Sequence, residues 1–499
     1  MRKTSATRTT APSAQNAFKA QAGYIPGMEA NGIHRQTLRF EAHGQCVEVE
    51  VLRPTPAQLA TLATSIIAAQ KQLAALPVME IVDAIDRSIA RMLEADTPER
   101  REIERLLPII SGFSPEMTRL GINACLKAFR RPQLLRFLVE DFGDPGLLDD
   151  FRPRPKGGWT RACGPALLAH VWAGNVPGLP LWSMVAGLLV KASGIGKMSS
   201  DEPLFASWFA HTLAEVDPRL ANALAVVWWP GGDTGLEQAL CQHADVLKVY
   251  GGDSAIAAWQ RRLPAGKRLL AHGYKLSVGL VSGTALDTRQ SQATARQAAL
   301  DILRWDQQGC YSPQTLFVER GAQVSPSEFA CHLAGELATL EHTFPRRALA
   351  LEESTSVAHW RQTLELEELR GEAIELLGST DAPWGIAYMD KPQAPLPTAL
   401  NRTACVMAVD SLEDAMPLLA GQRAVLQTVG LAASPEELFR LAPLIAEAGA
   451  TRICALGAMT TPEPGWHHDG RFSLLDLVRM VDIETSAETA AEALASYRN

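Results

Sequence analysis

The amino-acid sequence predicts an α/β protein with two α/β domains in sequence and a helical N-terminal layer. Helical periodicity dominates residues 56–142, and short apolar runs alternate with helical segments from residue 166 onward. Strands that are separated by helices pair in parallel through right-handed crossovers. The chain has 499 residues, 47% of them hydrophobic and 20% charged, which suffices for two or three domains with cores of their own.

The helical layer is predicted first along the chain. Apolar residues recur at spacings of three and four in AQLATLATSIIAAQKQL and in MEIVDAIDRSIARML, which is typical of amphipathic helices. Thr97 and Pro98 form a favourable helix start. The stretch FRPRPKGGW, Phe151–Trp159, is rich in proline and glycine and predicts a loop that ends this layer.

Buried strands of a parallel sheet are predicted next. Short apolar runs with helical segments between them occupy Ala166–Trp172, Ala223–Trp229, Asp245–Tyr250 and Leu276–Val281. A second alternating region follows Gly283, with helix starts at Ser325 and Ser434. Each of these serines precedes a proline, and a glutamate lies three residues on. The strands expected in this region are Gln314–Glu319, Arg402–Val409, Arg423–Gly430 and Thr451–Gly457.

These patterns predict four parts of the chain. Residues 1–45 are expected to be a flexible N-terminal segment, and residues 46–283 a first α/β domain that includes the helical layer. Residues 284–470 are expected to form a second α/β domain, and residues 471–499 a C-terminal segment that returns to the first domain or to a subunit interface.

Composition excludes several classes of function. A formal net charge of −8 argues against a general binder of nucleic acid or of anionic membranes, because both need a basic surface. The longest apolar run, Leu179–Val190, is too short to span a bilayer and is expected to be buried core. The eight cysteines are scattered without metal-ligand spacing, which favours a cytoplasmic protein without structural disulfides and without a metal site.

The first two dozen residues are basic and rich in serine, threonine and alanine, and they contain no apolar block. They predict a disordered tail rather than a secretory signal. A docking or encapsulation peptide is the alternative interpretation.

Polar and glycine residues follow several of the predicted strands, where open α/β sheets bind ligands. Asn175 follows the first strand, and Gly251 and Gly252 follow the third, before a helix that Asp253 and Ser254 open. Lys191 and Lys197 flank two glycines after the apolar run that ends at Val190, and this run is interpreted as a strand. Each feature alone has an ordinary explanation as a turn or a solvated lysine, and the sequence contains no GxGxxG fingerprint.

The stretch WDQQGCYSP adds Cys310, which follows two glutamines and a glycine. In order and placement these motifs resemble the aldehyde dehydrogenase superfamily and, within it, the LuxC-like acyl-CoA reductases, or fatty-acid reductases. The resemblance covers residues 160–480 and is carried by AGNVPGLPLWS, GKMSSDEPLFA, WWPGGD, VYGGD, RLPAGKRLLAHGYKLS, WDQQGCYSP and PEPGWHHDGRFSL.

The resemblance implies an aldehyde-dehydrogenase-like fold, with a Rossmann-type NAD(P)-binding domain over residues 46–283 and an α/β catalytic domain over residues 284–470. It also implies a covalent mechanism. Cys310 takes an acyl group from a thioester, and hydride from a nicotinamide cofactor then releases an aldehyde. Asn175 and the backbone amide of Cys310 are the expected oxyanion hole. The residues expected to bind the cofactor are Lys191, Ser193, Lys197, Gly251, Gly252, Asp253 and Ser254.

Two departures from the superfamily pattern refine this expectation. Hydrolytic aldehyde dehydrogenases carry a catalytic glutamate in a Glu-Leu-Gly-Gly-Lys segment, where this chain has Ala271, so reduction is favoured over hydrolysis. His272 follows it and is expected to bind the cofactor or to donate a proton. The glutamate that NAD-preferring relatives carry three residues after the motif lysine is Gly194 here, which favours NADP(H) over NAD(H).

Trp466–Asp469 is interpreted as a loop near the active site or at a subunit contact rather than a metal site, because no third ligand is evident.

The leading hypothesis is therefore an NADPH-dependent reductase of acyl-CoA or acyl-protein thioesters. An acyltransferase or acyl-protein synthetase is a candidate partner, and a homo-oligomer is expected. An aldehyde dehydrogenase, an acyl-phosphate reductase and a non-catalytic scaffold subunit of an acyl-transfer complex are the alternatives.

Overall fold

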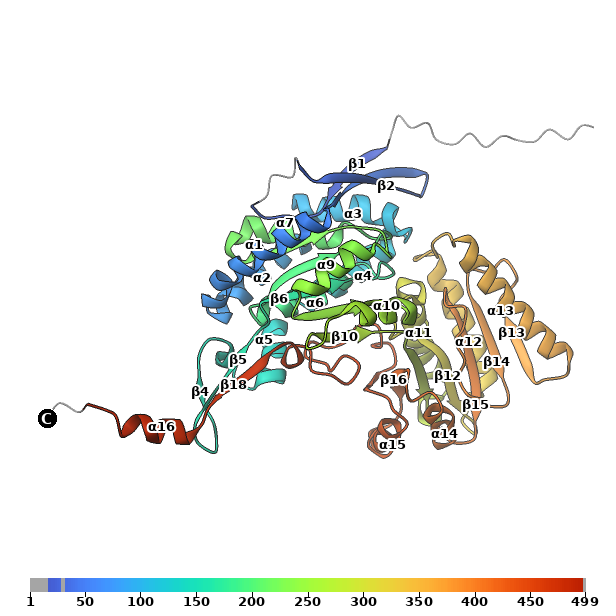
Figure 1. Ribbon diagram of the computed structural model, residues 1–499. Coiled ribbons are helices and arrows are strands. Elements are labelled where there is room, and N and C mark those ends of the chain that lie inside the picture. The colour runs from blue at the N-terminus through green and yellow to red at the C-terminus, as the bar shows by residue number, and fades with distance from the viewer. Residues whose placement is uncertain (1–16, 28–31, 497–499) are drawn as a thin grey trace, which may run out of the picture.

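A computed structural model describes residues 17–27 and 32–496 of the chain (Figure 1). It contains a five-stranded parallel sheet beneath a helical layer, a seven-stranded sheet beside it, and two three-stranded sheets. In Figure 1 most of the helical layer lies in the upper part of the picture and the seven-stranded sheet at the right. The α/β class and the helical layer that the sequence predicts are confirmed.

The N-terminal part is more ordered than predicted. Its strands form a three-stranded sheet in the order β1-β3-β2: β1 (Phe18–Ala22), β2 (His34–Ala42) and β3 (Gln45–Arg53). The prediction that residues 1–45 are flexible is therefore wrong for the strand residues. The alanines of β1 are weak strand signals, and its pairing with β3 decides the outcome. Residues 1–16, which include most of the proposed docking peptide, lie outside the described residues.

The helical layer follows the hairpin of β2 and β3. Proline is the first residue of three of its five helices and the second residue of another, where the missing backbone N–H leaves no intrahelical bond unmade. Thr55 caps the first helix, and Gln58 completes a capping box. The helices are α1 (Pro56–Ala75), α2 (Val78–Leu93), α3 (Pro98–Ser111), α4 (Pro115–Lys127) and α5 (Arg131–Phe142).

The five-stranded sheet is parallel throughout, in the order β10-β9-β6-β7-β8. Its strands are β6 (Leu167–Val171), β7 (Ser193–Lys197), β8 (Leu224–Val227), β9 (Val246–Tyr250) and β10 (Arg268–His272). The order reverses between β6 and β9, and ligands bind beyond the carboxyl ends of strands at such a reversal. The connecting helices are α6 (Leu179–Leu189), α7 (Phe205–Val216), α8 (Pro218–Ala221), α9 (Thr234–His243) and α10 (Asp253–Arg262).

The apolar run before Lys191 is helix α6 rather than a strand. Nearly every residue of α6 is buried, and a fully apolar run carries no periodicity that distinguishes a buried helix from a buried strand. Lys191 therefore precedes strand β7 instead of following a strand. This places it at the amino edge of the sheet, opposite the edge expected for a cofactor site.

The second sheet has seven strands in the order β13-β14-β15-β12-β11-β16-β17, and only β13 is antiparallel. The strands are β11 (Leu276–Val281), β12 (Pro313–Glu319), β13 (Ile374–Leu377), β14 (Gly385–Met389), β15 (Thr403–Val409), β16 (Leu426–Ala432) and β17 (Arg452–Ala455). Strand β11 pairs with β12 and β16, so it belongs to this sheet rather than to the cofactor domain as predicted.

Helices flank the seven-stranded sheet: α11 (Ser291–Leu303), α12 (Pro326–Glu341), α13 (Leu351–Leu369), α14 (Ala415–Ala420) and α15 (Pro435–Glu447). Ser325 and Ser434 cap α12 and α15 in the capping boxes that the sequence predicts. The 3₁₀ turn η5 (Arg304–Gln307) follows α11 and leads toward β12.

The C-terminal segment returns to the side of the five-stranded sheet. Strand β18 (Arg479–Ile483) pairs with β5 (Trp159–Cys163), which also pairs with β4 (Arg152–Pro153). In Figure 1 the last helix, α16 (Thr485–Glu492), extends from this small sheet away from the body of the protein. No single helix in the described part of the chain is long and apolar enough to cross a membrane. Only α1 and α2 together meet that criterion, and they are bent by 109°.

Candidate active site

A cavity of about 560 Å³ lies where the carboxyl edge of the five-stranded sheet meets the amino edge of the seven-stranded sheet. Its lining brings together five residues predicted from the sequence: Asn175, Gly251, Gly252, His272 and Cys310. They come from the loops after β6 and β9, from the end of β10 and from the segment before β12. Residues far apart in the chain therefore meet at one site.

Cys310 lies between η5 and β12, and its backbone carbonyl accepts a hydrogen bond of 2.8 Å from the Ser277 hydroxyl. Burial and the Asp469 carboxylate together raise the pKa of the Cys310 thiol to about 11, against the opposing effect of a hydrogen bond with the Gln427 side chain. The thiol is therefore protonated near neutral pH. Its use as a nucleophile requires a base in the cavity.

Asn175 follows β6 at the reversal of the strand order. Its side-chain nitrogen donates a hydrogen bond of 2.7 Å to the backbone carbonyl of Gln308, two residues before Cys310. An amide NH₂ group carries two N–H donors. One of them fixes the asparagine to the loop of the cysteine, and the second is free to bind an oxygen in the cavity.

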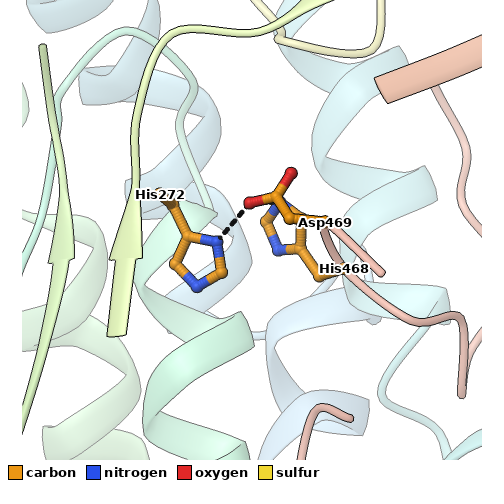
Figure 2. Close-up of side chains that lie close together, drawn as sticks. All are labelled: His272, His468 and Asp469. Atoms are coloured by element: carbon orange, nitrogen blue, oxygen red, sulfur yellow. Dashed lines mark hydrogen bonds and ion pairs between the residues drawn. The ribbon is translucent and has the colours of Figure 1, made fainter. Parts of the chain in front are cut away.

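His272, at the end of β10, is hydrogen-bonded to a carboxylate. Its Nδ1 lies 2.8 Å from Asp469 Oδ2, and Figure 2 shows the carboxylate turned toward this nitrogen. The second oxygen of Asp469 accepts a 2.6 Å hydrogen bond from Gln427 Nε2. Because the carboxylate accepts, Nδ1 carries the proton, and Nε2 is left as a base.

His272 belongs to a row of four stacked aromatic rings beside Asp469. Tyr250 and His272 lie with ring centroids 4.7 Å apart, His272 and His468 4.3 Å apart, and His468 and Trp466 4.7 Å apart. Burial lowers the pKa of His272 and lowers that of His468 well below its usual range. The hydrogen bond from His272 and the nearby imidazoles lower the pKa of Asp469 against the effect of its burial. The cluster therefore holds neutral imidazoles beside a charged carboxylate.

The same cluster resembles a metal site in composition. One ligand atom each from His272, His468 and Asp469 lie within 4.8 Å of one another, so His272 is a third potential ligand that the sequence analysis missed. The two imidazole planes are inclined by only 23°, however, and ring-nitrogen lone pairs lie in the ring plane. Stacked rings direct these lone pairs side by side rather than toward one ion. The geometry fits proton transfer better than coordination.

The residues predicted to bind the cofactor divide into two groups. Gly251 and Gly252 line the cavity, and no atom would lie within 4 Å of a Cβ added at Gly252. Asp253 and Ser254 form the exposed first turn of α10 beside them. Open backbone followed by a helix N-terminus fits the phosphates of a dinucleotide.

Lys191 and Ser193 do not belong to this site. Lys191 Nζ forms an ion pair of 2.7 Å with Asp149, and the Ser193 hydroxyl donates a hydrogen bond to the Ala166 carbonyl at the amino edge of the sheet. Their assignment to the cofactor site is corrected. Because the run before Lys191 is helix α6 and not a strand, Lys191 and Ser193 lie at the beginning of β7 rather than beyond the end of a strand. Lys197 occupies the carboxyl end of β7 instead, with Nζ 5.7 Å from the centroid of the Trp229 ring.

A Lys191→Met substitution tests this correction. Because it leaves Asp149 without its partner, we expect the free energy of unfolding to fall by about 1–3 kcal/mol. The KM for the nicotinamide cofactor is expected to stay within about twofold of the parent value, a change of less than ~0.5 kcal/mol. Urea unfolding and steady-state kinetics measure the two quantities. A large rise in the cofactor KM without loss of stability contradicts the correction.

Two residues of the site were not assigned a chemical role from the sequence. Asp469 was placed in a loop near the active site, and Gln427 was placed in a strand without a function. Gln427 is fully buried in β16, where the surrounding residues are apolar. A glutamine in an apolar strand was the available signal, because a buried amide needs hydrogen-bond partners.

Comparisons with known proteins agree with this geometry. The sequence model of the family described as acyl-CoA reductase (LuxC) matches residues 73–480. The chain is 27% identical over 400 residues to a long-chain acyl-protein thioester reductase of Photorhabdus laumondii, covering 79% of this chain and 80% of that relative. It is 27% identical over 380 residues to the long-chain acyl-protein thioester reductase 2 of Photobacterium leiognathi, covering 75% of each.

Solved structures show the same fold. Aldehyde dehydrogenase 21 of Physcomitrella patens superposes with a TM-score of 0.72 at 11% identity, covering 94% of this chain and 98% of that chain. The NADP-dependent glyceraldehyde-3-phosphate dehydrogenase of Bacillus halodurans superposes with a TM-score of 0.68 at 14% identity, covering 91% and 96%. The predicted aldehyde-dehydrogenase-like fold is thus confirmed, as is the resemblance stated from the motifs, and the chain is an oxidoreductase. It belongs to the acyl-CoA reductase (LuxC) family.

Proposed function

We propose that this protein reduces an acyl thioester to an aldehyde through a covalent thioester on Cys310. One observation carries the proposal: Cys310, Asn175 and His272 line a single cavity. A nucleophile, an oxyanion donor and an acid–base group are the three parts that acyl transfer to a thiol requires.

Acylation begins with removal of the Cys310 proton. His272 Nε2 accepts this proton, and Asp469 stabilises the imidazolium through Nδ1. The sulfur attacks the acyl carbon, and the charge that develops on the acyl oxygen is bound by the free N–H of Asn175 and the backbone amide of Cys310. Collapse expels the thiolate of the substrate, which takes the proton back from His272. The products are the Cys310 thioester and a free thiol.

Reduction of the thioester consumes one hydride and one proton. A nicotinamide held beside Gly251 and Gly252 supplies the hydride when it is bound. The oxyanion formed at the acyl carbon collapses to the aldehyde and expels Cys310 as a thiolate. His272, protonated from solvent, returns the proton to the sulfur. Ala271 stands where a hydrolytic glutamate would activate water, which supports reduction rather than hydrolysis.

The proposed substrate carries a long acyl chain on CoA or on a protein. One wall of the cavity is apolar and includes Ala124, Cys125, Ala128, Leu179 and Trp182. The relatives named above are long-chain acyl-protein thioester reductases, which supports the same class. A protein-bound substrate implies an acyltransferase or acyl-protein synthetase as partner. We also propose a homo-oligomer and a cytoplasmic location, the latter because all eight cysteines are free.

The proposed cofactor is NADP(H) rather than NAD(H). With Lys197 as the lysine at the strand end, the third residue after it is Ser200. A serine neither repels a 2′-phosphate nor replaces the two hydrogen bonds that a carboxylate makes to a ribose. Lys197 adds positive charge nearby.

Incubation with long-chain acyl-CoA and either cofactor tests the function and the cofactor together. We expect oxidation of NADPH with one aldehyde formed per cofactor, and a kcat/KM at least about tenfold lower with NADH, a difference of ~1.4 kcal/mol. Aldehyde oxidation is the control reaction. Rapid aldehyde oxidation without consumption of NADPH on acyl-CoA, acyl-phosphate or acyl-protein contradicts the proposal and favours an aldehyde dehydrogenase.

A further inference from the structure

Two left-handed segments of backbone face each other behind Cys310. Trp305, Asp306 and Gln307 have φ values of 54°, 47° and 66°. On the other segment the φ values are 53°, 53° and 69°, at Leu400, Asn401 and Arg402. All six are non-glycine residues, for which this region of backbone space is disfavoured by contacts of Cβ. Such a conformation persists only where the surrounding structure imposes it.

A buried ion pair joins the two segments. Arg402 forms a 2.6 Å ion pair with Asp306 Oδ1 through one terminal nitrogen, and its Nε donates to the same oxygen at 2.8 Å. Each side chain is 1% exposed. Arg402 also pairs with Glu341, and the backbone N–H of Arg347 donates to the other Asp306 oxygen at 3.1 Å. Asp306 also lies 3.9 Å from the Arg347 guanidinium, so each charge of the buried pair has a second ion-pair neighbour and the four side chains form one network.

The glutamines that follow Asp306 extend this connection toward the site. Gln307 Nε2 donates to the carbonyls of Pro313 and Thr403, at 2.7 and 2.9 Å, and Gln307 Oε1 accepts from the Thr403 N–H at 3.1 Å. Gln308 Nε2 donates to Asn401 Oδ1 at 3.0 Å. The Gln307 side chain therefore links the start of β12, at Pro313, to the start of β15, at Thr403. These bonds fix the stretch from Asp306 to Cys310, here called the nucleophile loop, to β15.

The nucleophile loop then meets the oxyanion donor. The Gln308 carbonyl accepts the hydrogen bond from Asn175, and Cys310 follows two residues later. Asp306 is four residues from the cysteine and touches neither the cavity nor its contents. Any rotation of the backbone from Trp305 to Gln307 therefore moves the Gln308 carbonyl. This movement changes the distance between Asn175 and the Cys310 sulfur.

We propose that Asp306 and Arg402 are positioning residues, whose buried ion pair holds the nucleophile loop in its left-handed conformation and so aligns Cys310 with Asn175 for acyl transfer. The inference rests on the proposed role of Cys310 as the acylated residue. It assigns the pair to the acylation step, before any cofactor takes part.

Acylation of the full-length chain by a long-chain acyl-CoA, without nicotinamide, tests this inference by mass spectrometry in single turnover. The variants are Asp306→Asn, Arg402→Met and the double variant, each with its urea midpoint. Each single variant leaves one buried charge with a single ion-pair neighbour, Glu341 for Arg402 or Arg347 for Asp306, so we expect lower midpoints as well as slower acylation. The double variant removes both buried charges, so we expect its midpoint to recover in part. Its acylation stays at least about 100-fold slower than that of the parent, which is ~2.7 kcal/mol of activation free energy.

The rate at which iodoacetamide alkylates Cys310 distinguishes a positioning role from a purely structural role. Alkylation needs the thiol but no oxyanion hole, so we expect the double variant to alkylate within about threefold of the parent rate, less than ~0.7 kcal/mol. If the double variant does not fold, Arg402→Lys serves instead, because it keeps the charge and loses the fork; acylation about tenfold slower is expected.

The control is a second ion pair, between the buried Arg100 and the half-buried Glu104 of α3, whose nitrogen and oxygen lie 2.8 Å apart. Substituting Arg100→Leu with Glu104→Gln is expected to lower the urea midpoint and leave the acylation rate of the folded protein unchanged. Acylation of the Asp306 and Arg402 double variant at the parent rate overturns the inference. Absence of acylation in the parent overturns the proposed function instead, so the two failures are distinguishable.

Discussion

A Cys310→Ser variant loses turnover of acyl thioesters by roughly 10⁴-fold or more, and no acyl adduct accumulates on the chain. Serine fills nearly the same volume, so the fold is retained. Its hydroxyl ionises far less readily than the thiol, which already has a pKa raised to about 11 by burial. The acyl mass on the peptide that contains residue 310, and its disappearance after addition of NADPH, are the measurements.

The control for this variant is Cys454→Ser. Cys454 lies in β17, and burial raises the pKa of its thiol also to about 11, so the two cysteines differ in place rather than in acidity. We expect the Cys454 variant to acylate at the parent rate. If Cys310→Ser remained acylated and active, Cys310 would not be the nucleophile, and another residue would carry the acyl group.

An Asp469→Asn variant slows acylation by roughly 10²–10⁴-fold. The amide can no longer stabilise an imidazolium, and it presents a donor as readily as an acceptor to Nδ1 of His272, so the tautomer with a basic Nε2 is no longer fixed. A His272→Gln variant, which removes the base altogether, is expected to show a loss in the same range. Single-turnover acylation followed by mass spectrometry measures both.

We also expect the Asp469→Asn substitution to change the pH dependence of the acylation rate. His272 must be neutral to accept a proton, and burial lowers its pKa, so the acid limb of the acylation rate lies below the ordinary histidine value of about 6.5. Asp469 counteracts that lowering by favouring the charged imidazole. Its replacement therefore moves the acid limb to still lower pH while the plateau falls. Asp482→Asn on β18 is the control, because that carboxylate pairs with Arg154 away from the cavity. An unchanged plateau for Asp469→Asn contradicts the acid–base role.

The strand-end residues were the part of the site that the sequence predicted best. Asn175, Gly251 and Gly252 follow short apolar runs flanked by helices, and parallel sheets place the ends of such runs on one edge. Lys191 failed for a specific reason. The residues before it are apolar on every side, so their pattern could not distinguish α6 from a strand, and one misassigned element reversed the edge on which the lysine lies.

Other contacts leave no trace in local patterns. His272 and Asp469 are 197 positions apart, and Gln427 joins them from a third element. Only the packing of the two sheets brings these residues together. The left-handed backbone from Trp305 to Gln307 cannot be read from the sequence either, because most aspartates, tryptophans and glutamines have negative φ and no local pattern marks the exceptions.

The segment between β17 and β18 connects the two large sheets and carries His468 and Asp469 in its middle. One end continues from the edge of the seven-stranded sheet. The other is held to β10 of the five-stranded sheet by Arg268, which donates to the carbonyls of Asp476, Leu477 and Val478. The segment is therefore attached to both large sheets, so the position of the Asp469 carboxylate beside His272 depends on both of them.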